Sequence, residues 1–587
     1  MYYYRYKVDK MKQTTACPLD CYDACRVVVN EEGRLKGDTS HPVTRGYLCP
    51  HLNHFTEHER LLVPRLRGEE ISMDKAIDTL IEVLKTSKSD EILYYRGSGN
   101  VGLMQRSPEH FFASIKALGT SGSLCDGAGE AGVLLGRGAN EVVSPQMIAE
   151  SEVVVFWGRN PHTSHSHLLP FLEGKTIIVI DPIQTEIAKK ADLHIQIKPH
   201  CDVHLALLLS RFAIIEGIHD VEFLDNHATQ YNDFYELTQS VRIKATLDAI
   251  AVSLGEIGSM LELMKGKKSV IFVGVGVQKY RNGADVLRAI DGFGAVMGLF
   301  GKNGCGVSYL GNSLEGINVP FESFSHRVSK PTLDFSKYNC VFVQGANPLA
   351  QMPNSNGVKS GFASAGFSVY FGLYENETSR EADLVIPAKT FLEKNDFRSS
   401  YGDYTLQEMP QLVESEIGIT EYELTRRLCE PFGVELENEA YYLDGFRDHI
   451  DVCNGVGYRR NSPEIPYKEG FVNGEFEFLD TIDLDSDKGE GFCLITSKYP
   501  RGLNSQFKRP EGVYFHPESG FEEGESVQLS SPSGEVEMIV KHDKRLRRDC
   551  LLIYSGTPDV NVLTPPFLSY EGESAVYQEI KIKVTKK

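Results

Sequence analysis

Short apolar runs alternate with segments of helical periodicity through most of the chain. Residues 73–89 place apolar side chains at helical spacing, and the segment 91–100, EILYYRGSGN, follows as a strand that enters a glycine-rich loop. The same order predicts further strands in SEVVVFWGRNP, KTIIVIDP, KKSVIFVGVGVQ, NCVFVQGANP and FSVYFGLY, each of which ends close to a polar or turn-forming residue. Strands separated by helices indicate parallel sheets of Rossmann type, in which ligands bind beyond the carboxyl ends of the strands.

The two ends of the chain follow different patterns. Near the amino end, CRVVVNEEGRLKG alternates around a turn and predicts a small hairpin. From 491 to 587, short β runs without long helices predict a β-barrel. We therefore expect an α/β protein with a small amino-terminal domain at 13–65, interleaved α/β domains at 66–430, a polar connector at 431–490 and the barrel at 491–587.

Composition narrows the class of protein. The chain of 587 residues has 61 basic and 81 acidic residues and a net charge of −20, so nucleic acid is not an expected partner. No apolar stretch is long enough to cross a bilayer, and the first residues contain no export signal, which predicts a cytoplasmic protein without a transmembrane segment. The true start of translation is either Met1 or Met11.

Four cysteines form the clearest chemical motif. Cys17, Cys21 and Cys25 lie in CPLDCYDAC, and Cys49 follows in GYLCPH. Three thiolates on one loop and a distant fourth suit the corners of a [4Fe–4S] cluster. A structural zinc site remains the alternative, although zinc ligands usually come as two C-x2-4-C pairs. The other cysteines are spread along the chain, which indicates a reducing compartment instead of a disulfide framework.

A fifth cysteine lies among small residues in GTSGSLCDGAGEAG. Cys125 is either a thiol that a bulky group approaches closely or an ordinary buried cysteine. The glycines that follow it match G-x-G-x-x-G, but a turn precedes them where a nicotinamide site requires a strand. We do not expect a nicotinamide cofactor.

Taken together, these motifs resemble those of the molybdopterin oxidoreductases of the dimethyl sulfoxide reductase superfamily. The resemblance rests on the four cysteines with RGYLCP and on VVVFWGRNP, IIVIDPIQTEIAKKADLHIQIKPHCD, GVGVQKYRNG, VQGANPLAQMPN, ETSREADLVIPAKTFLEKNDFRSSYG, GLNSQF and NVLTPPFLSYEGE. It covers nearly the whole chain, and it implies an iron–sulfur domain at 13–65 and a carboxyl-terminal barrel of the double-psi type. It implies two molybdopterin guanine dinucleotides that chelate molybdenum or tungsten, with the cluster as an electron relay.

The resemblance also assigns site residues. Cys125 would ligate the metal, as a soft thiolate can, with Asp126 beside it. One dinucleotide would contact Trp157, Gly158, Asn160, Pro161, Asp181, Thr185 and Asp202. The other would contact Gly274, Gly276, Gln278, Asn347, Pro348, Thr496, Asn504, Asn561 and Gln578. Asp202 would read guanine, or alternatively cap a helix that starts at Val203.

Departures from the family pattern bear on the substrate. Formate dehydrogenases carry histidine after the metal ligand and an arginine in a later loop, whereas this chain has Asp126 and no arginine in GVSYLGNSLEG. His51 stands where many relatives have lysine between cluster and pterin. The histidines of NPHTSHSH, His162, His165 and His167, are candidate proton donors or packing residues.

The sequence thus predicts an oxidoreductase that performs a two-electron oxygen-atom transfer or dehydrogenation on a small substrate. No flavin, nicotinamide or second cluster motif is visible, so we expect a separate electron-transfer protein or subunit as partner. The alternatives are a non-redox hydratase or transhydroxylase on the same scaffold, a formate dehydrogenase, and an electron-relay subunit that lacks the catalytic metal.

Overall fold

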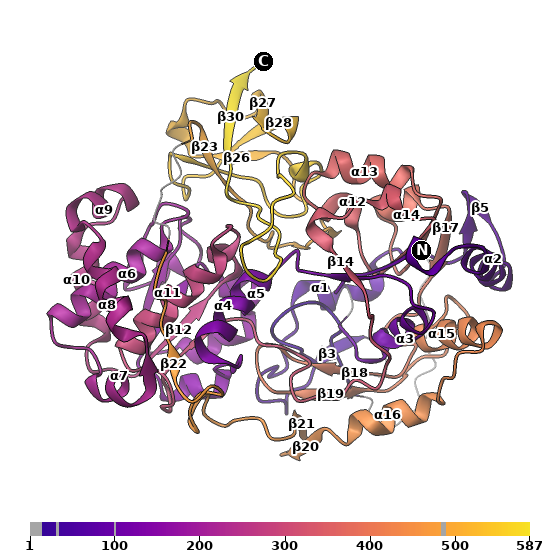
Figure 1. The fold of residues 1–587 in the computed structure, drawn as a ribbon, viewed down its shortest axis with the longest axis horizontal. Coiled ribbons are helices and arrows are strands. Elements are labelled where there is room, and N and C mark those ends of the chain that lie inside the picture. The colour runs from indigo at the N-terminus through magenta and orange to yellow at the C-terminus, as the bar shows by residue number, and fades with distance from the viewer. Residues whose placement is uncertain (1–13, 31–33, 99–100, 483–488) are drawn as a thin grey trace. The chain divides into compact units, whose positions relative to one another are not determined.

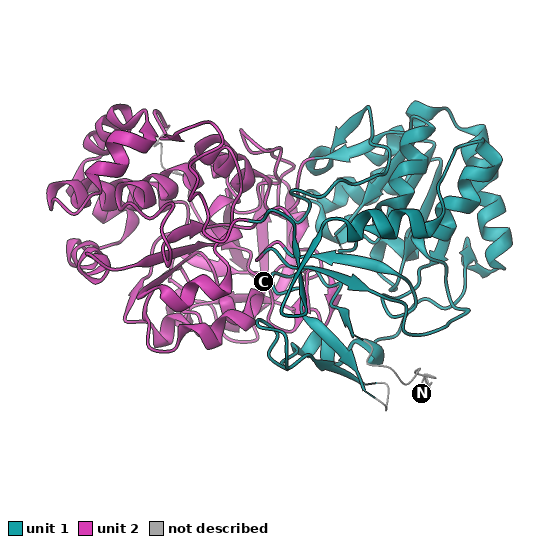
Figure 2. Cartoon of the chain, turned by 90° about the horizontal axis from the view of Figure 1, so that it is seen from below, with its two compact units in different colours: residues 1–121, 313–400, 404–462 teal, residues 122–312, 401–403, 463–587 magenta. Residues whose placement is uncertain are grey.

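The computed structural model describes residues 14–30, 34–98, 101–482 and 489–587 (Figure 1). The chain forms two compact units, and each is assembled from segments that lie far apart in the sequence. Figure 2 colours unit 1 (1–121, 313–400 and 404–462) teal and unit 2 (122–312, 401–403 and 463–587) magenta.

Unit 1 is built on a mixed sheet in which β6, β15, β16 and β17 run parallel and β4 and β5 add antiparallel strands at one edge. The sheet order is β5 (Glu69–Glu70), β4 (Arg65–Leu66), β17 (Leu384–Pro387), β16 (Phe367–Gly372), β15 (Cys340–Gln344) and β6 (Ile92–Arg96). Its helices are α1 (Pro50–Asn53), α2 (Met73–Thr86), α3 (Ser107–Ser114), α12 (Pro348–Gln351), α13 (Ser355–Ala363), α14 (Glu377–Glu381), α15 (Glu421–Cys429) and α16 (Glu439–Arg447).

Helix α2 shows how the sequence pattern becomes structure. Its N-cap Ser72 accepts a hydrogen bond from the Lys75 backbone N–H at 3.2 Å, which satisfies one of the free donors of the first turn. Its apolar face, with Ile77 and Leu80, is buried in one core with Tyr94 of β6. The predicted helix is confirmed.

Smaller sheets complete unit 1. The predicted hairpin is present as β2 (Arg26–Val29) against β3 (Leu35–Gly37), joined by β1 (Thr14–Ala16), and its Glu-Glu-Gly turn lies outside the described residues. The other pairs are β7 (Gly119–Ser121) with β14 (Arg327–Ser329), β18 (Asp396–Ser399) with β19 (Leu406–Met409), and β20 (Ile450–Cys453) with β21 (Val456–Arg459).

Unit 2 contains a parallel sheet that is buried on both faces. Along β8, Val155 faces one apolar core, whereas its neighbours Val154 and Phe156 face another. Burial of both faces explains why these strands are continuous apolar runs. The order is β10 (Leu193–Ile195), β9 (Thr176–Ile180), β8 (Val153–Trp157), β12 (Ser269–Val273) and β13 (Gly306–Ser308).

Helices surround this sheet, and a short parallel pair, β11 (Ala228–Thr229) with β22 (Phe476–Glu477), adds to the unit. The helices are α4 (Gly127–Arg137), α5 (Pro161–Ser164), α6 (Asp202–Ile215), α7 (Val221–His227), α8 (Tyr231–Ser240), α9 (Ile243–Ile250), α10 (Leu254–Met264) and α11 (Gly283–Val296). The parallel strands that the sequence predicted are therefore all present, in two separate sheets.

The carboxyl-terminal part of unit 2 is a closed barrel, as the sequence predicted. The barrel order is β23 (Phe492–Ile495), β29 (Cys550–Leu552), β26 (Val513–Phe515), β28 (Gly534–His542), β27 (Ser526–Ser531) and β30 (Lys581–Lys586). A short hairpin, β24 (Gly502–Leu503) with β25 (Gln506–Phe507), lies outside it. Within the described part of the chain, no helix has the length and apolar character needed to span a bilayer.

Candidate functional site

The four cysteines of the amino-terminal motif lie in unit 1. Cys17 and Cys25 are buried and Cys21 and Cys49 are half-buried. Burial raises the pKa of the Cys17 thiol, and the nearby Cys21 and Cys49 raise that pKa further. Burial likewise raises the pKa of Cys21 to about 12. The four sulfur atoms are therefore close enough to interact electrostatically, in an environment that disfavours bare thiolates.

Three polar side chains from the strand pair β18–β19 and its connection hold the cysteine loop. The buried Arg398 donates to the Cys17 and Cys21 carbonyls at 3.2 and 3.0 Å. Ser400 donates to the Tyr22 carbonyl at 3.0 Å, and Gln407 donates to the Ala24 carbonyl at 2.8 Å. The sequence prediction assigned none of these roles, although the run of buried polar residues in DFRSS is an unusual pattern for a strand.

His51 follows the cluster motif and is half-buried. Burial lowers the pKa of its imidazole, and the neighbouring His58 lowers it further. The imidazole at the position where the resemblance predicts lysine is therefore harder to protonate than a free histidine.

Cys125 lies in unit 2 with its side chain exposed and its backbone fixed on both sides. The Ser123 hydroxyl accepts a hydrogen bond from the Cys125 N–H at 3.0 Å and donates to the Asp126 carboxylate at 2.9 Å. Gln278 donates to the Cys125 carbonyl at 2.7 Å and accepts from the Gly129 N–H at 3.0 Å. Gln278, expected to contact a dinucleotide, thus also positions the loop that presents the thiol.

A lysine that the sequence prediction missed interacts electrostatically with this thiol. Burial lowers the pKa of Lys279, and the charge of Cys125 acts in the opposite direction. The Lys279 ammonium is 5.2 Å from the ring centroid of Tyr577, within reach of a cation–π interaction. The signal was available in GVGVQKYRNG, where a lysine directly follows Gln278.

Trp157, Asp181 and Asp202 are placed by the ends of β8, β9 and the start of α6. The Trp157 indole N–H donates to the Asp202 carboxylate at 2.8 Å. Burial raises the pKa of Asp202 to about 6 and that of Asp181 to about 7. The capping alternative for Asp202 is wrong, because α6 begins at Asp202 itself and its N-cap is Cys201.

The loops after β8 and β12 approach each other closely. A Cβ atom on Gly274 would lie 1.9 Å from the Gly158 carbonyl oxygen, so only glycine fits there. Gly276 is in the same loop as Gly274. Gly158 was expected to contact one dinucleotide and Gly274 and Gly276 the other, but all three lie at one edge of the unit 2 sheet. Asn160 donates to the Thr163 hydroxyl at 3.1 Å, whereas its own buried side-chain oxygen has no hydrogen-bond partner.

The remaining residues expected near the first dinucleotide have local roles. Pro161 is the first residue of α5, where a missing N–H costs little. The Thr185 hydroxyl accepts a hydrogen bond from the Ala188 N–H at 3.4 Å within its own turn.

The barrel residues also lie in unit 2. Gln578 donates to the Thr496 hydroxyl at 3.3 Å and accepts from the Tyr280 hydroxyl at 3.4 Å. Asn561 accepts from the Thr564 hydroxyl at 3.1 Å. Asn504 has a φ of 53°, the left-handed conformation that asparagine tolerates.

Asn347 and Pro348 are in unit 1, after β15. The Asn347 amide donates to the Glu377 carboxylate at 2.7 Å, and its oxygen accepts from the Thr378 hydroxyl at 3.0 Å. Pro348 is the first residue of α12. The Asn347 side chain thus ties β15 to α14, a structural role that the sequence did not suggest.

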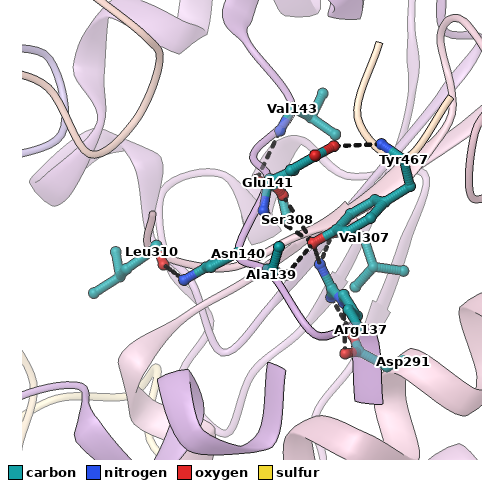
Figure 3. A network of polar contacts seen from close by, with 10 residues as sticks. All are labelled: Arg137, Ala139, Asn140, Glu141, Val143, Asp291, Val307, Ser308, Leu310 and Tyr467. Carbon is teal, nitrogen blue, oxygen red and sulfur yellow. Dashed lines mark hydrogen bonds and ion pairs between the residues drawn. The ribbon is translucent and has the colours of Figure 1, made fainter. Parts of the chain in front are cut away.

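The far end of α4 is anchored by Arg137, whose side chain is fully buried (Figure 3). Its guanidinium forms a bidentate ion pair with Asp291 of α11 and donates to the Val307 carbonyl of β13 at 2.8 Å. Tyr467 donates to the Ala139 carbonyl at 2.8 Å just beyond the helix. Because α4 begins two residues after Cys125, this network fixes the helix that carries the thiol loop.

The candidate histidines form no metal site. His165 is buried and bonded to Arg159 at 3.1 Å, while burial lowers the pKa of His162. Across the ranges that the structure describes, no three His, Cys, Asp or Glu side chains are spaced to bind a single metal ion. This holds for the amino-terminal cysteines as well.

Comparison with known proteins identifies the family. The molybdopterin oxidoreductase family model matches residues 79–430, which is more than half of the chain. The chain belongs to the molybdopterin oxidoreductase family. It is therefore a molybdopterin-dependent oxidoreductase, and the family implies a pterin cofactor that carries molybdenum or tungsten.

Two relatives from Bacillus subtilis (strain 168) are named probable oxidoreductases. The chain is 30% identical to YyaE over 68% of this chain and 66% of YyaE, and 26% identical to YoaE over 97% of this chain and 98% of YoaE. The structure resembles acetylene hydratase from Pelobacter acetylenicus with a TM-score of 0.79 and 17% identity, covering 98% of this chain and all of that one. The last likeness concerns the fold alone.

Proposed function

We propose that this family member is a bis-molybdopterin guanine dinucleotide oxidoreductase that uses molybdenum or tungsten and a [4Fe–4S] cluster. Its reaction would be a two-electron oxygen-atom transfer or dehydrogenation of a small substrate. The observation that carries this proposal is the exposed thiol of Cys125, whose backbone is fixed from both sides by Ser123 and Gln278. Such a thiol is suited to hold a soft metal in one place.

The cysteine loop of unit 1 suits a [4Fe–4S] cluster. Its four thiols are close enough to interact electrostatically. Neutralising iron would remove the mutual repulsion of the four thiolates, and Arg398 would keep the loop in shape. The cluster would serve to pass electrons to and from a partner.

Several features of unit 2 fit a guanine dinucleotide. The carboxylate of Asp202, the first residue of α6, is held by the Trp157 indole, and guanine N–H groups are donors to such a carboxylate. The partnerless oxygen of Asn160 and the close approach of Gly158 and Gly274 suit a ligand that lies against the backbone. The role of this chain is to bind and orient the group, and the bound metal would supply the redox chemistry.

Lys279 gives the site a positive group that favours an anionic substrate. The missing arginine after 306 disfavours formate, but the Lys279 ammonium places a positive charge beside Cys125. A small anionic substrate could thus be oriented by Lys279 through a charge-assisted hydrogen bond. A formate dehydrogenase therefore remains among the alternatives.

A hydratase is a second candidate because of one residue. Asp126 directly follows Cys125, and its carboxylate is oriented by the Ser123 hydroxyl at 2.9 Å. A carboxyl group at this position could transfer a proton in a hydration that needs no electrons. Turnover without any electron acceptor would favour the hydratase, whereas dependence on a redox dye favours the oxidoreductase.

We also propose an electron-transfer partner, a cellular location and domain limits for the protein. Since the sequence contains no flavin or nicotinamide motif, electrons would be exchanged with a separate electron-transfer protein or subunit, and the location would be cytoplasmic. The domain limits predicted from the sequence, 13–65, 66–430, 431–490 and 491–587, remain a proposal beside the two observed units.

The test compares Cys125→Ala with Cys453→Ala after anaerobic purification. Cys453 is the matched control because it is also exposed but lies on β20, outside every proposed site. We expect Cys125→Ala to lose turnover of sulfur oxides, nitrogen oxides, formate or aldehydes in a dye-coupled screen while the cluster absorbance stays. Full activity of Cys125→Ala would contradict its role as ligand. A protein with iron but neither molybdenum nor tungsten would be an electron-relay subunit.

A further inference from the structure

Two cysteines outside the proposed redox site face each other in the barrel. Cys493 of β23 and Cys550 of β29 are direct partners in the register of neighbouring parallel strands. Neighbouring strands lie about 4.8 Å apart, which is within the Cα separation that a disulfide spans. Both side chains pack in the same small apolar cluster, with Ile495 and Leu552. Both are free thiols in the structure.

A lysine lies on the other side of Cys493. Lys581 is the antiparallel partner of Cys493 on β30, and its ammonium donates to the Cys493 sulfur at 2.8 Å. A hydrogen bond from Cys550 and the charge of Lys581 lower the pKa of Cys493, although burial acts against them. The Cys550 thiol donates to the Asp549 carboxylate at 3.4 Å.

This arrangement differs from that of an ordinary buried thiol. Cys340 of β15 is fully buried, and burial alone acts on it and raises its pKa to about 12. The thiolate is the reactive form of cysteine, and an adjacent lysine favours it. Cys493 has an exposed fraction of 6%, and Lys581 beside it is half-buried.

We propose that Cys493 and Cys550 are a peroxide-sensitive thiol pair that forms a reversible disulfide. In the first step, the Cys493 thiolate attacks one oxygen of hydrogen peroxide, the O–O bond breaks, and hydroxide leaves to take up a proton as water. Cys493 is then a sulfenic acid. In the second step, the Cys550 sulfur gives up its proton and attacks the Cys493 sulfur.

The S–O bond breaks in that second step, and the hydroxide leaves with the Cys550 proton as a second water. The two sulfurs together lose two electrons, which reduce one peroxide to two waters. In a reducing compartment the disulfide would be transient, as is usual for redox-sensing pairs. Cys201 is a third thiol close enough to Cys493 for their charges to interact, and it offers a competing partner.

The experiment uses the full chain, purified anaerobically with its bound groups. The protein is treated with hydrogen peroxide, the remaining thiols are blocked after denaturation, and the peptides are analysed by mass spectrometry. We expect a peptide linked through Cys493 and Cys550 that a dithiol reductant separates again, while Cys340 stays reduced. The proposal is overturned if Cys493 stays reduced at a dose that oxidises the exposed Cys453, or if its partner is Cys201.

A variant tests the part played by the lysine. Lys581→Gln should slow formation of the disulfide by about tenfold or more, because the thiolate loses its cation. Lys583→Gln is the matched control, since Lys583 is exposed on the same strand two residues away. Equal rates in the two variants would contradict the role of Lys581 and, with it, the activation of Cys493.

Discussion

Replacing Arg137 by methionine should destabilise unit 2 strongly. Arg137 and Asp291 are both fully buried, with the Arg137 Nε atom 2.7 Å from an Asp291 oxygen. The substitution removes the cation and the hydrogen bond to the Val307 carbonyl but leaves the carboxylate in place. Burial raises the pKa of Asp291 and only Arg137 and Arg288 oppose it, so the remaining charge is poorly compensated. Breaking a buried pair in this way costs about 3–5 kcal/mol.

Arg426→Met is the matched control. Arg426 also binds a carboxylate through two nitrogens, with Glu423 at 2.8 and 2.7 Å, but this pair is exposed on α15 of unit 1. Exposed pairs contribute about 0–1 kcal/mol because water screens both charges. The same chemical change should therefore have a small effect there.

The assay is thermal unfolding of each variant, since a chain with two units does not justify a single free energy. At about 2.1 cal/mol/K of unfolding entropy per residue, one kcal/mol shifts the midpoint of a unit of this size by roughly 1.5 °C, so Arg137→Met should lower the unit 2 transition by about 4 °C or more. The double variant Arg137→Met with Asp291→Leu should recover much of that loss, because it removes the unpaired charge. Equal shifts for Arg137→Met and Arg426→Met, or a double variant no better than the single one, would refute this reasoning.

Three further predictions concern the site. Arg398→Met should reduce the iron content and the cluster absorbance, since it frees the loop of Cys17 and Cys21, whereas Arg427→Met on the surface should leave both unchanged. In protein without its cofactor, burial raises the pKa of Asp202 to about 6, so the folded state keeps a proton that the unfolded chain releases above pH 4. Stability should thus fall as pH rises from about 4 to about 6. The melting temperature of Asp202→Asn should fall less steeply over this pH range than that of the unchanged protein, and an equal slope of melting temperature against pH would contradict this. Gln278→Leu should lower turnover and molybdenum or tungsten content at constant iron, because it releases the Cys125 carbonyl and the Gly129 N–H; unchanged kinetics would argue against this positioning role.

The strands were predictable from the sequence because the physics that selects them is local. A strand buried on both faces is apolar at nearly every position, as in β8, and the run ends where the backbone turns. The barrel strands were predictable for the same kind of reason, since Val527 and Leu529 alternate with polar neighbours along β27.

The partners of the site residues were not predictable, because they come from distant parts of the chain. Arg398 is more than 370 residues from the cysteine carbonyls that it holds. Gln278 reaches Cys125 across about 150 residues. The resemblance predicted that Asn347 contacts a dinucleotide. Only the structure shows that its side chain is hydrogen-bonded to Glu377 and Thr378. Sequence spacing identifies the groups that carry chemistry, and tertiary structure decides what holds them.

The central claim, that Cys125 and the four amino-terminal cysteines hold two different metal centres, is tested most directly by metal analysis of the anaerobically purified chain and its variants. The account predicts molybdenum or tungsten together with roughly fourfold as much iron. It predicts that Cys49→Ser removes iron, and that Cys125→Ala keeps the iron but loses turnover. Zinc in place of iron, or full activity of the Cys125→Ala protein, would contradict it.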